Sequence, residues 1–253
     1  MRVRLSAAAF ALAFLLIGAT GWAADRHVHF RVPPPVGEKI ASMPQIIDPV
    51  DDAETRVNAA LTRLDETVRE AAGGCTSFDG KPGSWERTIE VPMRGPGYVS
   101  FVITDNTYCG GAYPDVSTMS IVYDLRAGAP VDWTRLLPAS LTGTLALQEG
   151  ADGTKMVTLA SKRLFELYLA GYRAGDKSAD ARECKQVIQD SAGDNPPPMM
   201  VWLDAKVGGL AVQFELPHAV QVCEETVVVP LTTIRAEGAQ SILVDAIQKA
   251  QQQ

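Results

Sequence analysis

The stretch between residues 106 and 115 holds the residue types that a recognition loop uses. Tyr108 and Tyr113 flank the pair Gly110–Gly111, and glycine permits backbone conformations that are closed to other residues. Tyrosine is enriched at recognition surfaces because its large ring is ordered at low entropic cost. The alternative is that the glycines only let the loop pack tightly while both rings fill the core. The candidate binding residues are Asn106, Tyr108, Gly110, Gly111, Tyr113 and Asp115.

No motif in the chain specifies a catalytic reaction. The sequence has no nucleophile elbow, P-loop, dinucleotide fingerprint or zinc-binding HExxH helix. His27 and His29 stand at strand spacing without a third ligand, so we expect no metal site. His218 is the one remaining base for a nucleophilic dyad. We therefore expect a non-catalytic protein without a cofactor. The enzymatic alternative is a hydrolase of peptidoglycan or another glycan that uses carboxylates such as Asp105 and Asp115.

The four cysteines predict two disulfides. Three pairings of Cys75, Cys109, Cys184 and Cys223 are possible, and the shortest chain closures favour Cys75–Cys109 together with Cys184–Cys223. Metal sites use clustered cysteines such as C-x-x-C, and the four positions are not clustered. An even number of paired cysteines is typical of an oxidising compartment.

The N-terminus has the pattern of an export signal. Two arginines precede an apolar run over residues 7–18, and Gly21 and Ala23 then place small side chains before a cleavage point. This predicts a signal peptide over residues 1–23 and a periplasmic or secreted mature chain. An uncleaved N-terminal anchor is the alternative. No second hydrophobic run follows, so we expect no membrane insertion after the signal is removed.

The charge balance restricts the partners. The formal net charge is −7, and removal of the two arginines in the signal makes it more negative. Such a chain is repelled by nucleic acid and anionic lipid, and it is compatible with a basic protein partner. We therefore expect no nucleic-acid partner.

Hydrophobic periodicity predicts a three-stranded antiparallel meander in the first half of the chain. The expected strands are residues 85–93, 98–104 and 119–123, and we interpret residues 105–117 as a long shaped loop. A helix over residues 53–72, capped by Asp51 or Asp52, precedes the meander. Residues 26–32 alternate as a first strand, and Asp132 caps a short helix.

In the second half of the chain, the sequence predicts few helices and strands at the start and several near the C-terminus. From residue 141 the chain reads as polar and irregular, and an amphipathic helix follows over residues 161–174. A helical turn around residues 185–190 is expected. Three strands and a terminal helix follow, at residues 199–204, 209–216, 225–231 and 241–250.

This order of elements is typical of an α+β fold with antiparallel sheets and amphipathic helices packed on one face. No linker interrupts it, so residues 24–253 are interpreted as a single unit. A division into two lobes, residues 24–140 and 141–253, stays open.

The chain also resembles a known family, the RsiV/PdaC-like extracytoplasmic domains. The family occurs in the lysozyme-sensing anti-sigma factors of the RsiV type and in the N-terminal part of the peptidoglycan deacetylase PdaC. Its pattern of a helix, a Y-x-G-G-A-H-P loop, a Y-D-L-x-x-G strand end and two final strands is matched across nearly the whole mature chain. The matching residues are Pro44, Ile46, Asn58, Leu61, Tyr108, Gly110, Gly111, Ala112, Pro114, Tyr123, Asp124, Leu125, Gly128, Leu136, Leu137, Gly209, Leu210, Val212, Phe214, Val227, Val229, Pro230 and Leu231.

The resemblance implies an extracytoplasmic α+β module that binds lysozyme in one well-known member. Tyr113 replaces the histidine that the family usually has before the proline. The sigma-binding segment and the deacetylase domain have no counterpart in this sequence, so neither activity is expected. We expect an exported envelope binding module for lysozyme or cell-wall glycan. The alternatives are the hydrolase and a structural periplasmic protein without a small ligand.

Overall fold

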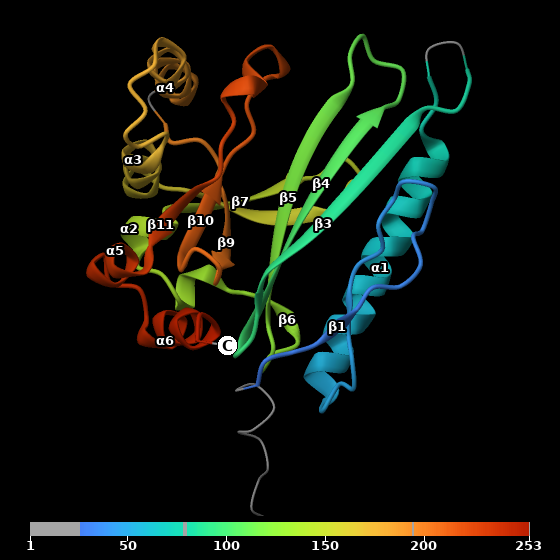
Figure 1. The fold of residues 1–253 in the computed structure, drawn as a ribbon, viewed down its shortest axis with the longest axis horizontal. Coiled ribbons are helices and arrows are strands. Elements are labelled where there is room, and N and C mark those ends of the chain that lie inside the picture. The colour runs from blue at the N-terminus through green and yellow to red at the C-terminus, as the bar shows by residue number, and fades with distance from the viewer. Residues whose placement is uncertain (1–25, 78–79, 194, 253) are drawn as a thin grey trace, which may run out of the picture.

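The computed structural model describes residues 26–77, 80–193 and 195–252. The predicted signal peptide, residues 1–23, lies outside these residues. Figure 1 shows two antiparallel sheets side by side, with one long helix beside the first sheet and a group of helices beside the second.

The first sheet has the strand order β3-β4-β5-β6, and the predicted meander is confirmed. Ile103 pairs with Met119, and Phe101 pairs with Ile121. The strands extend further than the sequence suggested, so the connection between β4 and β5 is only residues 109–114. The prediction of a long loop over residues 105–117 was therefore wrong. The strands are β3 (Ser84–Arg94), β4 (Tyr98–Tyr108), β5 (Asp115–Asp124) and β6 (Ala129–Pro130).

Helix α1 (Asp52–Gly74) covers one face of this sheet (Figure 1). We call the face toward α1 the inner face. Of the two candidate caps, Asp51 is the one used, since its Oδ1 accepts a hydrogen bond from the Glu54 amide at 2.9 Å. Val57, Leu61 and Val68 recur at helical spacing and are fully buried. The apolar stripe of α1 therefore packs against the sheet, as its periodicity predicted.

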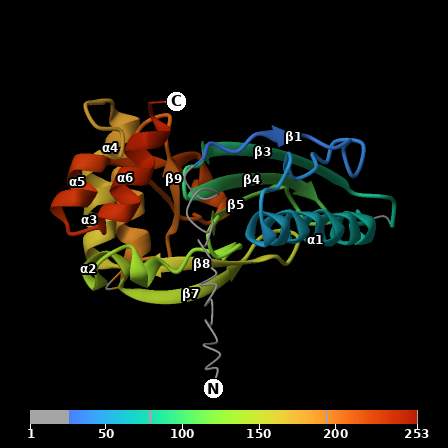
Figure 2. The ribbon, with the colours of Figure 1, turned by 90° about the horizontal axis from the view of Figure 1, so that it is seen from below.

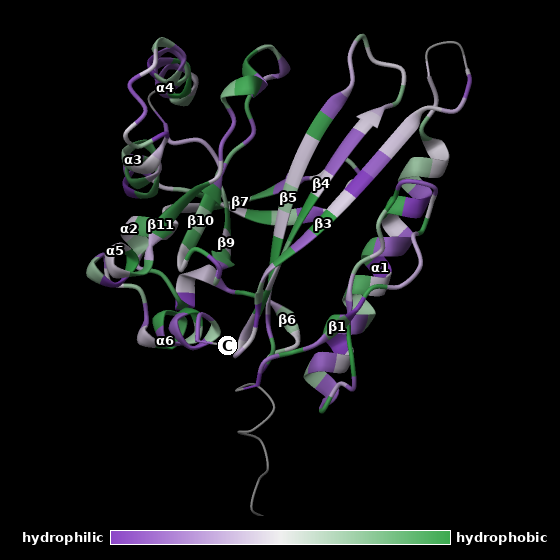
Figure 3. Cartoon of the chain, viewed as in Figure 1, coloured by the Kyte–Doolittle hydropathy of each residue, from purple (hydrophilic) through white to green (hydrophobic). Residues whose placement is uncertain are grey.

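The second sheet has the order β11-β10-β9 and lies against the other face of the first. The Ser100 hydroxyl accepts from the Leu203 amide, and the Ser120 hydroxyl donates to the Val201 carbonyl, so polar contacts join the sheets. In Figure 3 the strands of the second sheet are mostly apolar, whereas the upper halves of β3 and β4 in the first sheet are polar. The elements are β9 (Met200–Asp204), β10 (Gly209–Gln213), β11 (Val227–Pro230), α3 (Lys162–Gly171), α4 (Ala179–Ala192), α5 (Leu231–Ala236) and α6 (Ser241–Ala250).

Two predictions for irregular or extended segments were wrong. The region after residue 141 contains the hairpin β7 (Thr144–Glu149) and β8 (Lys155–Ala160), which Figure 2 shows running toward α1. The predicted first strand is reduced to β1 (Phe30–Arg31), which pairs with β2 (Gln45–Ile46). The remaining short elements are η2 (Trp133–Arg135), capped by Asp132 as predicted, α2 (Ala139–Thr142) and η3 (His218–Cys223).

The α+β fold class with antiparallel sheets is confirmed. One cluster of buried apolar side chains extends from Leu61 of α1 through Phe101 to Leu210 and Ile247. Among the described residues, no helix is long and apolar enough to span a bilayer.

Candidate functional site

The loop between β4 and β5 is anchored at its base by a disulfide. Cys109 follows β4 directly and is bonded to Cys75, the C-cap residue of α1. Gly110 adopts a φ of 92°, a conformation that other residues rarely adopt, whereas Gly111 does not show a positive φ. The disulfide and the glycine turn thus fix the course of the chain toward Tyr113.

A second segment, far away in the sequence, is anchored in the same way. Cys223 ends η3 and is bonded to Cys184 of α4. Both disulfides therefore have the pairing that the shortest closures favoured. This pairing indicates that the chain folds in an oxidising, extracytoplasmic environment.

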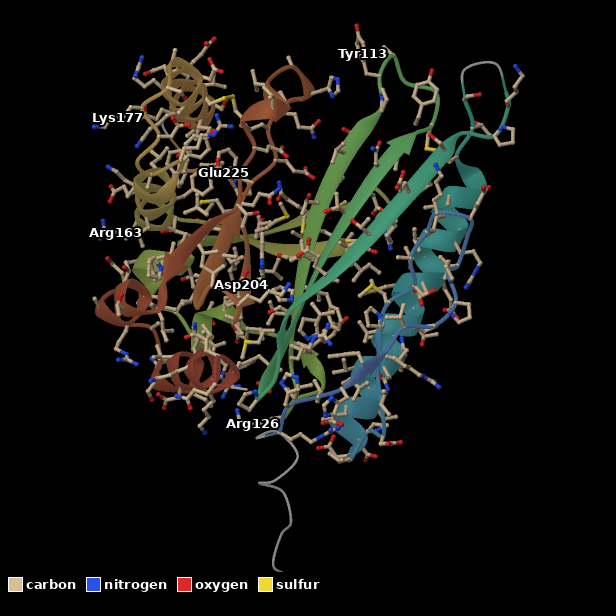
Figure 4. All side chains as sticks on the ribbon, viewed as in Figure 1. Tyr113, Arg126, Arg163, Lys177, Asp204 and Glu225 are labelled. Atoms are coloured by element: carbon tan, nitrogen blue, oxygen red, sulfur yellow. A yellow bond between two sulfur atoms is a disulfide. The ribbon has the colours of Figure 1, made fainter. Side chains whose placement is uncertain are left out.

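The two anchored segments come together. The ring of Tyr113 stacks on His218, with centroids 5.4 Å apart and planes 20° apart. Gln221 Nε2 donates to the Val116 carbonyl at 2.6 Å, and Ser117 Oγ donates to Glu215 Oε1 at 2.9 Å. We call this surface, residues 109–117 and 215–224, the rim. Figure 4 shows Tyr113 at its tip.

The two tyrosines of the loop have different environments. The Tyr113 side chain is 69% exposed and points away from the core, whereas Tyr108 is half-buried. Val222, on the other half of the rim, is 83% exposed. The rim therefore presents an aromatic pair and an aliphatic side chain to solvent, a composition that is typical of recognition surfaces.

The rim also carries three carboxylates that lie close to one another. Asp115 begins β5, Glu215 follows β10, and Glu224 follows η3. Burial raises the pKa of the Glu224 carboxyl, and the nearby Glu215 and Asp115 carboxylates raise it further. The three side chains therefore form a local concentration of negative charge.

The predicted site residues do not all lie in the loop. Asn106 and Tyr108 belong to β4, and Asp115 belongs to β5, because the strands are longer than expected. Asn106 is exposed and pairs with Val116 across the strands. Only Gly110, Gly111 and Tyr113 of the six candidates lie within the connection itself.

Asp105, which the hydrolase alternative invoked, lies in a buried ion cluster. Arg87 donates to both carboxylate oxygens of Asp105 at 2.7 and 2.6 Å, and to Asp152 at 2.8 Å. Trp85 Nε1 adds a hydrogen bond to Asp105 at 2.7 Å. The side chains of Arg87 and Asp152 have no exposed surface. The Asp105 carboxylate is thus buried and fully engaged, although Ser117, its partner across the strands, belongs to the rim.

The histidines are divided between two places. His27 and His29 contact each other with ring centroids 5.6 Å apart, whereas His218 belongs to the rim. Within the described ranges, no three histidine, cysteine or carboxylate side chains converge in the manner of a metal site.

Sequence reasoning missed half of the rim. His218 was considered only as a base for a nucleophilic dyad. Glu215, Gln221 and Glu224 were not linked to the loop, because nothing in their spacing connects them to Tyr113. The one available signal was Cys223, a second disulfide cysteine close to a lone histidine.

Comparisons with known proteins give a likeness in fold. No protein-family model and no curated protein sequence matches the chain. A member of the DUF3298 family from Bacteroides fragilis has a similar structure, with a TM-score of 0.51 and 14% identity over 87% of this chain and 95% of that one. A DUF3298 family protein from Pseudomonas aeruginosa aligns with a TM-score of 0.45 and 14% identity, over 87% of this chain and 94% of its own. The first likeness supports the fold alone.

Proposed function

We propose that this protein is an exported, non-catalytic binding module of the cell envelope, and that its rim binds a basic protein such as lysozyme. The exposed Tyr113–His218 stack is the observation that carries the proposal. An aromatic pair held in solvent between two disulfide-anchored segments is already ordered before binding. Preorganised surfaces lose less conformational entropy on association, so they bind more tightly.

The charge of the rim favours a cationic partner. Asp115, Glu215 and Glu224 belong to the same rim as the stack, and the whole chain carries a net charge of −7. Opposite charges accelerate encounter and fix orientation more than they increase affinity. The resemblance to the RsiV/PdaC-like domains points to the same class of partner. Tyr113, in place of the family's histidine, offers a larger apolar surface for the contact.

A periplasmic or secreted location is part of the same proposal. Both disulfides support export, and a rim that binds lysozyme or peptidoglycan would act in the envelope. Peptidoglycan glycan is the second candidate ligand of the rim, since exposed aromatic rings also stack on sugars.

Binding measurements on the purified protein test the proposal. We expect calorimetry to detect a complex with a basic lysozyme or with solubilised peptidoglycan, and we expect the double variant Tyr113→Ala/His218→Ala to bind at least about tenfold more weakly. The matched control is the variant Tyr108→Phe, which changes a half-buried ring of β4 outside the rim. We expect this variant to bind with wild-type affinity. Absence of binding to both ligands, or equal affinity of a folded Tyr113→Ala/His218→Ala variant, would refute the role of the rim.

A further inference from the structure

A groove lies between α1 and the turn that joins β5 to β6. This turn follows the C-terminal end of β5, and the rim lies at the opposite end of the same strand. Its volume is about 780 Å³, and its walls include Arg56, Arg63, Thr67, Tyr123, Pro130 and Thr154. Gly128 closes one end. Its φ is 62°, and a Cβ there would lie 2.5 Å from the Ala53 carbonyl oxygen, so the turn touches the first residues of α1.

The groove continues into a smaller apolar pocket. The pocket has a volume of about 300 Å³ and shares Leu64, Tyr123, Pro130 and Thr154 with the groove. Hairpin β7–β8 covers it with Met156 and Val157, while Trp133 and Val131 line the other side. Small-molecule sites are typically of this size, mostly apolar and equipped with a few polar groups.

Two arginines line the groove, and in the part of the chain that the structure describes neither has an anionic partner. Arg56 Nη2 donates to the Ala127 carbonyl at 3.1 Å, a contact that holds the guanidinium beside the groove. Arg63 lies on the same face of α1 and is exposed. Neither arginine forms a salt bridge within the described residues. The two guanidinium groups thus place positive charge beside an apolar pocket in a chain with a net charge of −7.

A mostly buried tyrosine lies where the groove and the pocket meet. Tyr123 is only 4% exposed and lines both the groove and the inner pocket. Its hydroxyl donates no hydrogen bond to any described residue. Burial raises the pKa of Tyr123 to about 12, so the hydroxyl keeps its proton at neutral pH and can donate it to a ligand.

We propose that this groove binds a single-chain anionic amphiphile, with the acyl chain in the inner pocket and the anionic head group at Arg56 and Arg63. The Tyr123 hydroxyl donates a hydrogen bond to the head group. An unbranched chain fits the apolar pocket because it brings no polar groups that burial would leave unsatisfied. A peptide backbone in the same place would bring donors and acceptors along its whole length.

Dodecanoate, used below its micelle concentration, is the probe for this site. Calorimetry on the protein expressed with its own export signal is expected to show saturable one-to-one binding. Dodecyltrimethylammonium has the same chain with a cationic head, and its affinity is expected to be lower by at least about tenfold. A 12-bromododecanoate titration is expected to quench Trp133, and the quenching is expected to decrease in Trp133→Phe.

Two variants locate the complex. Arg63→Glu is expected to weaken dodecanoate binding by at least about tenfold. Arg69 is also exposed on α1 but does not line the groove, so Arg69→Glu is expected to leave the affinity unchanged. Val157→Phe narrows the inner pocket and is expected to favour octanoate over dodecanoate. The proposal is overturned by absence of saturable binding, by equal affinity for the cationic probe, or by equal affinity of Arg63→Glu. It is also overturned if an acidic amphipathic peptide binds the groove more tightly than dodecanoate.

Discussion

The long sheet β3–β4–β5 is stabilised differently at its two ends. Near the β3–β4 turn it is apolar on the inner face, where the Phe101 and Tyr123 rings meet with centroids 6.3 Å apart, and it is covered by β9 on the other. Toward the rim, the inner face carries the Arg87–Asp105 ion pair, and the Cys75–Cys109 disulfide anchors the tip. The end near the β3–β4 turn is stabilised by buried apolar side chains. The rim end is stabilised by an ion pair with hydrogen bonds and by a disulfide. The disulfide needs little covering surface, and Tyr113 beyond it remains exposed.

The largest expected effect at the rim end is the loss of Arg87. In Arg87→Ala the carboxylates of Asp105 and Asp152 stay buried without a cation, so we expect the free energy of unfolding to fall by about 3–5 kcal/mol. Urea denaturation at pH 7 measures this change. Arg31→Ala, an exposed arginine of β1, is the control and is expected to stay within about 0.5 kcal/mol of wild type. A loss below about 1 kcal/mol in Arg87→Ala would show that the rim end does not depend on the ion cluster.

The disulfide contributes next. Removing the Cys75–Cys109 bond in Cys75→Ser/Cys109→Ser frees a closure of 34 residues, which corresponds to about 3–4 kcal/mol in the chain-entropy model. We expect the amides at residues 109–113 to exchange through local opening in this variant, whereas the Phe101 amide still exchanges through global unfolding and accelerates only in proportion to the lost stability. If the amides at residues 109–113 also exchange only through global unfolding, the distinction between the two ends is removed.

A core substitution between the two ends gives a smaller effect. Ile103 is fully buried, so Ile103→Val should lower the free energy of unfolding by about 0.5–1.5 kcal/mol. Because Ile103 lies outside the ion cluster and the disulfide, this loss and that of Cys75→Ser/Cys109→Ser should add within about 0.5 kcal/mol. Thermal or urea unfolding of the triple variant checks this. A clear departure from additivity would mean that burial and the disulfide act as one unit.

The smallest expected effect is the pH dependence of the rim. Burial raises the pKa of Glu224 above its ordinary 4.5, so the fold favours the protonated form. This group's contribution to stability is complete below pH 4.5 and decreases as the pH rises through the raised pKa. Glu224→Gln should therefore unfold at a slightly higher temperature at pH 7 and no higher at pH 4. A higher unfolding temperature of equal size at both pH values would show that the gain is not electrostatic.

The sequence predicted the elements whose burial follows a simple period. Helix α1 and the central parts of β4 and β5 have apolar residues at the expected spacing. The ends of the strands were not predictable, because Asp105 and Ser117 read as loop residues unless their partners Arg87 and Glu215 are known. Polar residues enter these strands through contacts with segments that are distant in the sequence.

The hairpin β7–β8 and the second half of the rim were missed for related reasons. The β7 strand is mostly exposed and includes Leu147 on its surface, so its residues alternate without a clear buried face. The meeting of Tyr113 with His218 joins segments that are 105 residues apart in the sequence (218 − 113). Periodicity reports burial, and it does not report which loops meet.

Hydrogen exchange with and without a saturating basic lysozyme tests the central claim most directly. If the rim is the recognition surface, the amides at residues 109–115 and 217–224 exchange more slowly in the complex, while those of β9, β10 and α1 do not change. No change at the rim, or protection confined to other elements, would contradict the account.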